Sequence, residues 1–508
     1  KDGSAAAIYG ARGSSGVILV TTKTAGKGEA ATNITYNGFI TIDEVANKID
    51  VLSADEYVAN GGTDFGNDTD WFEELTQTGV SYTSNLSISG ALGPSTSYRA
   101  SVNYRNNEGI VKGSTFERLN TRLNVQHSAV DGRLRFNINA SVNNRDQESI
   151  NLEAFRYATI YNPTAPIFES DVTGSTLEDE SADDRATRLL NADQNFDGYF
   201  QRDLFDFFNP VALAEQQTFE NQRRNFLSSF RVEYDILDEL TVGVSYSQER
   251  FEDQERQFWS SFDAQTGRGQ QGLAQRQSTN NFTEILSGTA NYTRELTEGL
   301  DASFLVGAET QRRNNENFGV RVRQFLLDDQ SFDNLGFGAI REGNQTNAFS
   351  GRTKDELNSV FARVNLTYNN FLFFSGSIRR ESFSGFGEDE KSGTFPAVSL
   401  GAELTEIVDL GPFDGLKLRA SFGVTGNLPP QPNLAIATFT PGNRIDLDGD
   451  PLTRGDIYTS FVQSRDPNPG LKWEEKTEIN VGVDFSLFEG KLTGSMDYYT
   501  RDIEDLLF

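Results

Sequence analysis

The feature that most constrains the fold is a strict alternation of apolar and polar residues on both sides of Asp131-Gly132. An Asp-Gly pair at such a centre is typical of a two-residue type I′ turn between antiparallel strands. Because successive side chains of a strand point to opposite faces, this turn fixes which residues face each other. The predicted pairs are Ala129 with Leu134, His127 with Phe136, Val125 with Ile138 and Leu123 with Ala140. The pattern therefore predicts a sheet that is apolar on one face and polar on the other.

Two later hairpins show the same division between faces. A turn at Glu489-Gly490 sets the apolar positions of 481–498 opposite each other. Around residue 370, a two-residue loop would leave the apolar sets out of register, so we predict a three-residue loop, Asn369–Phe371, in which Asn tolerates the left-handed conformation. The predicted pairs are Leu487 with Leu492, Phe485 with Gly494, Val483 with Met496, Tyr368 with Leu372 and Leu366 with Phe374.

Composition excludes several classes of protein. The chain has 508 residues, a mean hydropathy of −0.50 and no apolar run that approaches the ~18 residues of a membrane-spanning helix. Alternating strands average out to polar, so a membrane barrel stays compatible with these values. The absence of Cys excludes disulfides and thiol chemistry. The net charge of −29 argues against nucleic acid and disfavours polyanionic cargo.

Connections between the expected strands alternate between short and long, which is typical of outer-membrane barrels with periplasmic turns and extracellular loops. We count about fifteen strands, whereas bacterial barrels close with an even number and plugged transporters have about 22. We therefore expect this chain to be a fragment of a larger barrel. The principal long loops are expected at 43–83, 144–225, 251–283, 312–358 and 425–475.

The opening segment, 1–23, has a different pattern. It predicts a short Ala-rich helix at Asp2–Tyr9 and a strand at Val17–Thr22. Between them lies a glycine-punctuated turn containing Gly10, Arg12, Gly13 and Gly16. A phosphate-binding glycine loop follows a strand and opens a helix, whereas this turn follows a helix and opens a strand. We therefore interpret it as a structural turn.

The opening segment resembles the end of the plug domain of TonB-dependent outer-membrane transporters, and specifically their SusC-like branch. The similarity continues through the expected barrel and keeps the same order along the chain. The stretches that carry it are 69–71, 98–104 with 107–111, 208–211, 357–380, 393–397, 416–427, 468–474 and 497–507.

This resemblance implies an all-β fold, a large antiparallel transmembrane barrel, in the outer membrane of a Gram-negative bacterium of the Bacteroidetes. Residues 1–32 would be the end of the plug and a linker, and residues 33–508 a partial barrel with about 15 of about 22 strands. The plug unit would sit inside the barrel and shift when the periplasmic motor pulls. The implied partners are a SusD-like surface lipoprotein and the TonB–ExbB–ExbD complex.

Aromatic residues that we expect to be exposed in the long loops are candidates for substrate contact, since flat apolar rings stack on sugars and also bind peptide side chains. The alternative is that they pack loop against loop. The candidates are Trp71, Phe72, Tyr199, Phe200, Phe258 and Trp259.

An acidic segment resembles the first half of a calcium-binding loop. Asp193, Asn195 and Asp197 stand at alternate positions before Gly198, but the twelfth position, normally a bidentate Glu, is Leu204. A solvated loop is the alternative to a structural calcium site. No other cofactor is indicated, and no paired carboxylates or nucleophile suggest catalysis.

These observations predict active import of a large hydrophilic nutrient, because a polar lumen admits such cargo and a plug blocks passive flow. By resemblance to the family, a glycan oligomer is the first choice of cargo, an oligopeptide the second, and a siderophore or cobalamin the third. The rival is a non-transporting barrel or β-rich adhesin. The adhesin predicts that the apolar faces pack against another sheet.

Overall fold

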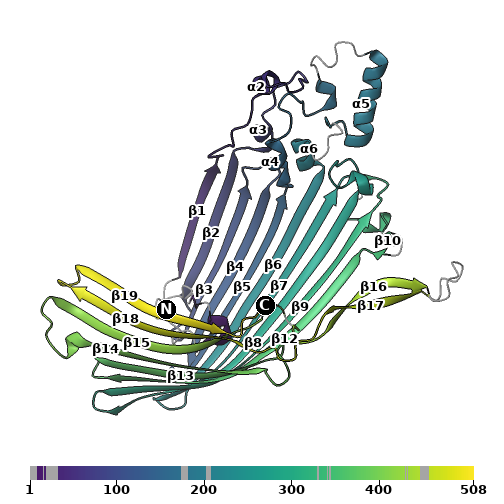
Figure 1. Cartoon of the computed structure of the whole chain (residues 1–508). Coiled ribbons are helices and arrows are strands. Elements are labelled where there is room, and N and C mark those ends of the chain that lie inside the picture. Colours follow the sequence, from purple (N-terminus) through teal and green to yellow (C-terminus); the bar gives the residue numbers. More distant parts are fainter. Residues whose placement is uncertain are drawn as a thin grey trace.

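The computed structural model describes residues 8–14, 16–18, 32–172, 181–201, 207–328, 331–339, 341–342, 345–429, 431, 433–446 and 457–507. One curved antiparallel sheet of 15 strands dominates the molecule (Figure 1), and its strands are neighbours in chain order. They are β1 (Asn33–Asp43), β2 (Gly79–Ala91), β3 (Thr96–Glu108), β4 (Thr115–Ala129), β5 (Leu134–Ser149), β6 (Gln217–Asp235), β7 (Leu240–Trp259), β8 (Leu273–Thr297), β9 (Leu300–Arg323), β12 (Ala348–Tyr368), β13 (Leu372–Phe383), β14 (Ser392–Glu403), β15 (Phe413–Asn427), β18 (Glu474–Leu487) and β19 (Leu492–Glu504). The predicted fold class and strand number are confirmed.

Smaller elements occupy the connections. Two separate hairpins, β10–β11 (Arg341–Glu342 and Gln345–Thr346) and β16–β17 (Thr438–Asp446 and Ile457–Arg465), lie outside the large sheet. The helices are α2 (Ala54–Ala59), α3 (Trp71–Leu75), α4 (Glu153–Ala158), α5 (Ala182–Phe196) and α6 (Pro210–Glu215), with 3₁₀ turns η1 (Gly10–Gly13), η2 (Glu169–Asp171), η4 (Arg268–Gln270), η6 (Leu335–Phe337) and η7 (Leu404–Glu406). Helices α2–α6 gather at one end of β1–β6 and form what we call the cap (Figure 1). None of the helices among the described residues is long and apolar enough to cross a lipid bilayer.

The registers predicted for the three hairpins are confirmed. The observed pairs include Ala129 with Leu134, Leu123 with Ala140, Tyr368 with Leu372, Leu366 with Phe374, Leu487 with Leu492 and Val483 with Met496. Asn369 and Asn370 both have positive φ, the left-handed conformation that Asn tolerates. In the turn after β4, positive φ already begins at Val130, one residue earlier than in a type I′ turn.

Two of the expected long loops are shorter than predicted because the strands that flank them are longer than expected. Strands β7, β8 and β9 span 20, 25 and 24 residues, so the loops expected at 251–283 and 312–358 shrink to 260–272 and 324–347. The turn between β8 and β9 is only two residues, 298–299. Polar residues, such as those at 252–257, continue the ladder, because the part of a strand that extends past the apolar band no longer needs apolar side chains on either face.

The sheet has two chemically distinct faces. We define the outer face as the one that carries Leu123, Ile138 and Val306, which are 42 %, 41 % and 55 % exposed. Cross-strand partners extend this apolar band around the sheet, for instance from Ile138 to Phe230 and on to Tyr246. Among the described residues no second sheet covers the band, contrary to what an adhesin would need.

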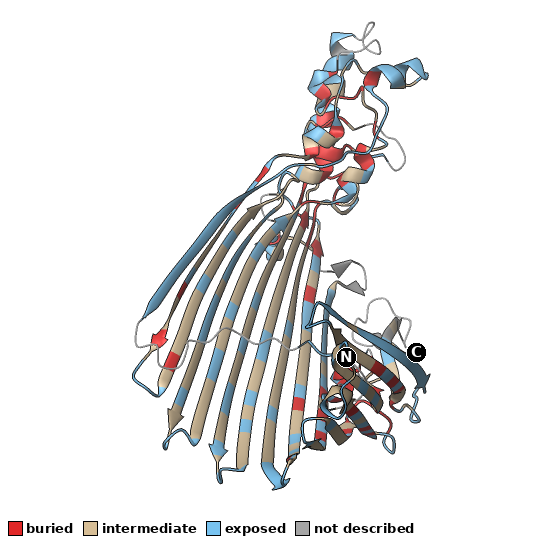
Figure 2. Ribbon diagram, turned by 90° about the vertical axis from the view of Figure 1, so that its left-hand side faces the viewer, coloured by how far each residue is buried: buried red, intermediate tan, exposed pale blue. Residues whose placement is uncertain are grey.

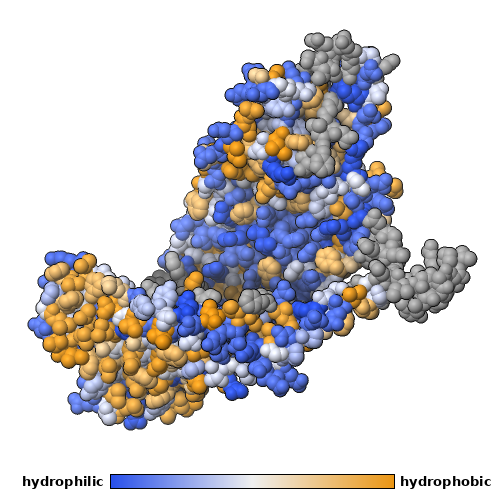
Figure 3. Space-filling view, viewed as in Figure 1, coloured by the Kyte–Doolittle hydropathy of each residue, from blue (hydrophilic) through white to orange (hydrophobic). Residues whose placement is uncertain are grey.

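The figures agree with this division. Figure 2 shows that buried residues gather in the cap and on β12–β15 and β18, while most positions of the tall strands are intermediate or exposed. In Figure 3 hydrophilic residues cover the middle of the view over β5–β8, and hydrophobic residues gather over β14, β15, β18 and β19 at lower left. An exposed apolar band of this extent is what lipid-facing strands display.

Candidate functional site at the inner face

Residues 8–14 lie against the polar side of the sheet, which we call the inner face. The 3₁₀ turn η1 holds Gly10, Ala11 and Gly13 buried. Ala11 joins an apolar cluster on the inner side of β12–β14 that includes Phe383 and Phe395. Of the strand predicted at Val17–Thr22, only Val17 and Ile18 are described and neither is in a strand; the helix predicted at Asp2–Tyr9 lies outside the described residues except for its last two positions.

A buried cluster of charged side chains grips the first half of this segment. The guanidinium of Arg379, 3 % exposed, pairs through Nε with Oε1 of Glu381 at 2.8 Å and through Nη2 with Oε1 of Glu309 at 3.2 Å. It also donates to Oγ of Ser359 at 2.7 Å. Arg12 adds a second cation on Glu309, at 2.6 Å. We call Arg12, Glu309, Ser359, Arg379 and Glu381 the anchor cluster.

The backbone of the segment completes the anchor cluster. The carbonyl of Ile8 accepts from Nη1 of Arg379 at 3.1 Å, and the N–H of Ala11 donates to Oε2 of Glu381 at 2.8 Å. The guanidinium also lies 5.1 Å from the ring centroid of Phe361. A buried ion pair is tolerated only when its remaining donors and acceptors are satisfied, and here the opening segment supplies part of that satisfaction. Strand β13 is thus bonded to residues 8–11 and β9 to Arg12, while Ser359 of β12 accepts from Arg379.

The second half of the segment is held by two further strands. The hydroxyl of Ser14 bonds to the side-chain oxygen of Asn427 on β15, and Nζ of Lys476 on β18 donates to the carbonyl of Ser14. Asn427 in turn donates to Glu474 at 2.6 Å. Residues 8–14 are therefore bonded directly to four strands of the sheet, β9, β13, β15 and β18.

Gly10 sits where only glycine fits. Its φ is +70°, and a Cβ there would lie 2.1 Å from Oε1 of Glu381 and 2.5 Å from Nε of Arg379. Gly16 has φ +111°, but its Cβ position is open. Gly10 and Gly16 of the predicted turn thus differ: Gly10 is required by both conformation and contact, Gly16 by conformation alone.

This difference gives a prediction. Gly10→Val should displace residues 8–14 from the anchor cluster, because the left-handed conformation costs about 1–2 kcal/mol and the new side chain overlaps Glu381. Gly16→Val is the matched control, since it adds only the backbone strain. We expect the ion conductance of the full-length protein in planar bilayers to rise for Gly10→Val and to change little for Gly16→Val. Equal conductance of the two variants would contradict the assignment.

The loop aromatics predicted to meet substrate are mostly buried. Trp71, Tyr199, Phe200 and Phe258 are at most 7 % exposed, so the expectation that these rings are exposed is wrong. The first three belong to the cap's core, where Trp71 stacks edge-on against Tyr161 at 5.2 Å and donates from Nε1 to the carbonyl of Asn162. Packing of loop against loop, the alternative considered above, accounts for them.

The remaining aromatic candidates also have protein partners. Phe72 is half-buried and lies 6.1 Å from Phe155 in the cap, while Trp259, the last residue of β7, packs edge-on against Phe219 at 5.6 Å. Burial, together with a hydrogen bond to Glu215, raises the pKa of the Tyr199 hydroxyl, which therefore stays protonated. The cap is a small folded unit with its own apolar core.

The segment predicted as a calcium loop is a helix. Asp193 and Asn195 lie in the last turns of α5, and Asp197 ends it in the left-handed conformation. Asn195 donates to the carbonyl of Asn191 and accepts from Arg268. A helix spreads alternate residues around its axis, so these oxygens do not converge as in a calcium loop. Within the described part of the chain, no three His, Cys, Asp or Glu side chains are grouped to hold a metal.

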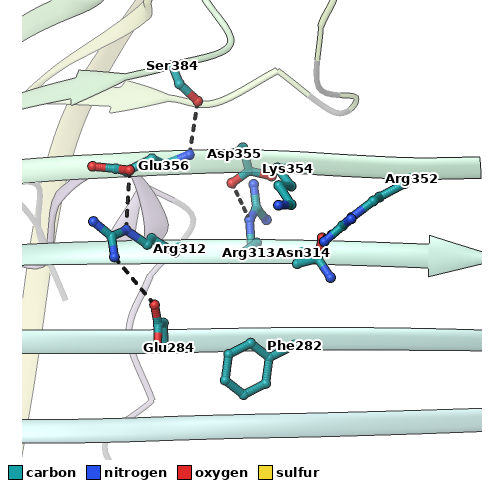
Figure 4. A pocket seen from close by; sticks show the side chains of 10 residues that line it. All are labelled: Phe282, Glu284, Arg312, Arg313, Asn314, Arg352, Lys354, Asp355, Glu356 and Ser384. Atoms are coloured by element: carbon teal, nitrogen blue, oxygen red, sulfur yellow. Dashed lines mark hydrogen bonds and ion pairs between the residues drawn. The ribbon is translucent and has the colours of Figure 1, made fainter.

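A charged pocket of about 490 Å³ lies across β8, β9 and β12 (Figure 4). Arg312 bridges Glu284 at 3.7 Å and Glu356 at 3.3 Å, whereas the neighbouring Arg313 pairs with Asp355 at 2.7 Å. By register, Arg312 belongs to the outer face and Arg313 to the inner face. The Arg312 bridge therefore marks where the apolar band of the outer face ends.

Sequence parity alone could have placed Arg379 and Glu381 on the inner face, since Ile378 belongs to the apolar set. It could not have shown that residues 8–11, more than 360 positions away, complete their hydrogen bonds. The anchor cluster is therefore the functional feature that sequence reasoning missed.

Comparison with known proteins fits this arrangement. A family model described as TonB dependent receptor-like, beta-barrel, matches residues 161–508. The TonB-dependent receptor SusC of Bacteroides thetaiotaomicron is 28 % identical over 530 residues, and the TonB-dependent receptor P3 of Formosa agariphila is 30 % identical over 521; both alignments cover all of this chain. The chain spans about half the length of these curated relatives, 50 % and 49 %.

The fold is also found among solved structures. The structure titled "Structure of the RagAB peptide transporter" superposes with a TM-score of 0.80 at 19 % identity, covering 99 % of this chain and 58 % of the other. A likeness at this identity concerns the fold. Together with the family match over more than half of the sequence, it leads to one conclusion: the chain belongs to the TonB-dependent receptor-like β-barrel family.

Proposed function

We propose that the full-length protein imports a large hydrophilic nutrient, a glycan oligomer, across the outer membrane of a Gram-negative bacterium. The observation that carries this proposal is the position of residues 8–14. They lie against the inner face of a sheet whose outer face is apolar, and they are bonded directly to four of its strands. A wall that is lipid-facing outside and polar inside suits hydrophilic cargo, and an obstacle held by buried ion pairs requires work to move.

The proposal also includes an energy source for transport and a partner protein. Work on the anchored segment would come from the TonB–ExbB–ExbD complex, and a SusD-like lipoprotein would cover the outer opening. Many neutral hydrogen-bonding side chains line the inner face, for example Asn137, Asn139 and Ser141 on β5, and these match sugar hydroxyl groups. Nothing in the anchor cluster resembles a catalytic constellation, so we propose no enzymatic step.

Uptake by intact cells tests the proposal. Cells that carry the full-length transporter should accumulate labelled oligosaccharides, and deletion of TonB or collapse of the proton gradient should abolish accumulation. Oligopeptides of similar mass form the second arm of the assay. Accumulation that persists without TonB would refute active import, and accumulation of peptides alone would replace the glycan assignment. Extraction of the protein by water without detergent would refute the membrane location.

A further inference from the structure

Four arginines on four neighbouring strands occupy directly opposite positions. Arg105 of β3 faces Arg118 of β4, Arg118 faces Arg145 of β5, and Arg145 faces Arg223 of β6. The register places all four on the inner face, the same face as Glu309. We call Arg105, Arg118, Arg145 and Arg223 the arginine row. With neighbouring strands about 4.8 Å apart, the row spans about 14 Å, the length of an oligomer rather than of a single small ion.

The charge of this row is largely uncompensated by the protein. Like charges directly opposite each other destabilise a sheet, so the arrangement is costly without a counter-charge. The inner positions of β3, β4 and β5 carry no carboxylate, and those of β6 carry only Glu233 and Asp235, near the turn at the far end. On β7, next to Arg223, the inner positions carry Glu249, Asp253 and Glu255, and the carboxylate of Asp253 pairs with Arg223 at 2.9 Å. The part of the row without a facing carboxylate is therefore Arg105, Arg118 and Arg145. In a chain of net charge −29, such a cluster is not a product of composition.

The donors of the row are available. Arg118 is exposed and makes no hydrogen bond or ion pair to any residue that the structure describes. Nε of Arg145 is buried without a partner, and its Nη2 has only a 3.4 Å bond to Asn221. Arg105 donates to Asn107 and lies 5.1 Å from the ring centroid of Phe116. Guanidinium groups bind carboxylate and sulfate oxygens through paired N–H donors.

A second row runs beside the first, two residues along each strand. It consists of five asparagines in mutually opposite positions, Asn85, Asn103, Asn120, Asn143 and Asn225. Each amide offers two donors and an acceptor, which complements hydroxyl groups that both donate and accept. We call this set the asparagine row. Charged and neutral hydrogen-bonding side chains thus form two parallel rows on the same strands.

The two rows lie between the cap and the anchored segment. The row of Glu309 crosses the sheet through Ser287 and Ser245 to Arg231. Arg223 stands eight residues farther along β6, which is about 26 Å at 3.3 Å per residue. Cargo that enters from the cap end would meet the arginine row before it meets residues 8–14.

We propose that these two rows form a binding track for an oligosaccharide that bears carboxylate or sulfate groups. The arginine row binds the anionic groups and the asparagine row binds the sugar hydroxyls. This inference rests on the proposed function and specifies its cargo. The net negative charge of the chain disfavours binding of polyanions at long range. Within the lumen, the nearby arginine row attracts them.

Calorimetric binding to the full-length protein tests the proposal with four probes of equal length: a neutral oligosaccharide, a uronate-bearing one, a sulfated one and an oligoglutamate peptide. We expect an anionic oligosaccharide to bind at least tenfold more tightly than the neutral one, and this advantage to shrink as salt rises. The double variant Arg118→Gln/Arg145→Gln should remove most of it. Arg118→Lys/Arg145→Lys should restore part of it, since the charge returns without the paired donors.

Arg224→Gln is the matched control, because Arg224 adjoins Arg223 on β6 but belongs to the outer face. Equal affinity for the neutral and anionic oligosaccharides, stronger binding of oligoglutamate, or equal losses in the double variant and in Arg224→Gln would each overturn the proposal. So would a rise in conductance of the double variant with unchanged cargo affinity, which would assign the row to a plug contact. TonB-dependent uptake of neutral oligosaccharides would then still support the proposed function.

Discussion

Glu381→Ala is expected to free residues 8–14 from the sheet and to open a conducting path through the full-length protein. The substitution removes the carboxylate that pairs with Arg379 at 2.8 Å and accepts from the N–H of Ala11 at 2.8 Å. Arg379 is 3 % exposed and would keep only the more distant Glu309 as a counter-charge. Breaking a buried pair by removing one partner typically costs about 3–5 kcal/mol. Part of this cost is relieved if the opening segment leaves and water enters.

Conductance in planar bilayers measures this release, and thermal unfolding of the same variant measures the cost. Glu381→Gln keeps an acceptor for Ala11 but loses the charge, so an intermediate conductance is expected. The double variant Arg379→Met/Glu381→Leu removes both charges and should recover thermal stability. Its conductance should nevertheless stay high, because the apolar side chains no longer bind the backbone of residues 8–11. A Glu381→Ala protein as closed and as stable as the unmodified one would refute the role of the anchor cluster.

The fold could be read from the sequence because strand registers depend on local chemistry. Asp131-Gly132 and Glu489-Gly490 each fix a turn, and parity then assigns every residue of two strands to a face. The extent of β8 could not be read in this way. On the N-terminal side of Leu286 most of its outer positions are polar, among them Glu284, Asn280 and Ser278, so this part of the strand has the composition of a loop. Only pairing with β7 and β9 shows that it continues.

The candidate functional site could not be predicted, because it depends on tertiary contacts that no local sequence pattern contains. The sequence predicts an exposed loop position for Trp71, whereas its ring packs against Tyr161 of a second loop in the core of the cap. Asp193 and Asn195 matched a calcium loop by spacing, yet the Ser181 N-cap starts a helix that runs through both. The same limit explains the anchor cluster: parity predicts an inward Glu381, while its partner at Ala11 is set by tertiary structure.

Val306→Arg is expected to prevent stable insertion of the full-length barrel into lipid. Val306 is 55 % exposed in the middle of the outer apolar band and pairs with Ala290, while the nearest outer charge on its strand, Arg312, lies six residues away. An arginine that faces lipid near the bilayer midplane costs about 2–4 kcal/mol, and much less near the interface. Folding into lipid vesicles, followed by the heat-dependent shift of the folded barrel on gels, measures the loss.

Thr289→Arg is the matched control, which tests whether the loss depends on the face of the sheet that carries the new arginine. Thr289 faces Gly307, the residue next to Val306, so the two new arginines lie at nearly the same depth. Thr289 belongs to the inner face, where the facing Gly243 leaves room on one side while the ring of Phe361 lies over Gly307 on the other, and water solvates the guanidinium. Insertion should therefore fail for Val306→Arg and proceed for Thr289→Arg. The opposite outcome, or equal losses in the two variants, would mean that the apolar band does not face lipid. The inner face could then not be assigned as the path of the cargo.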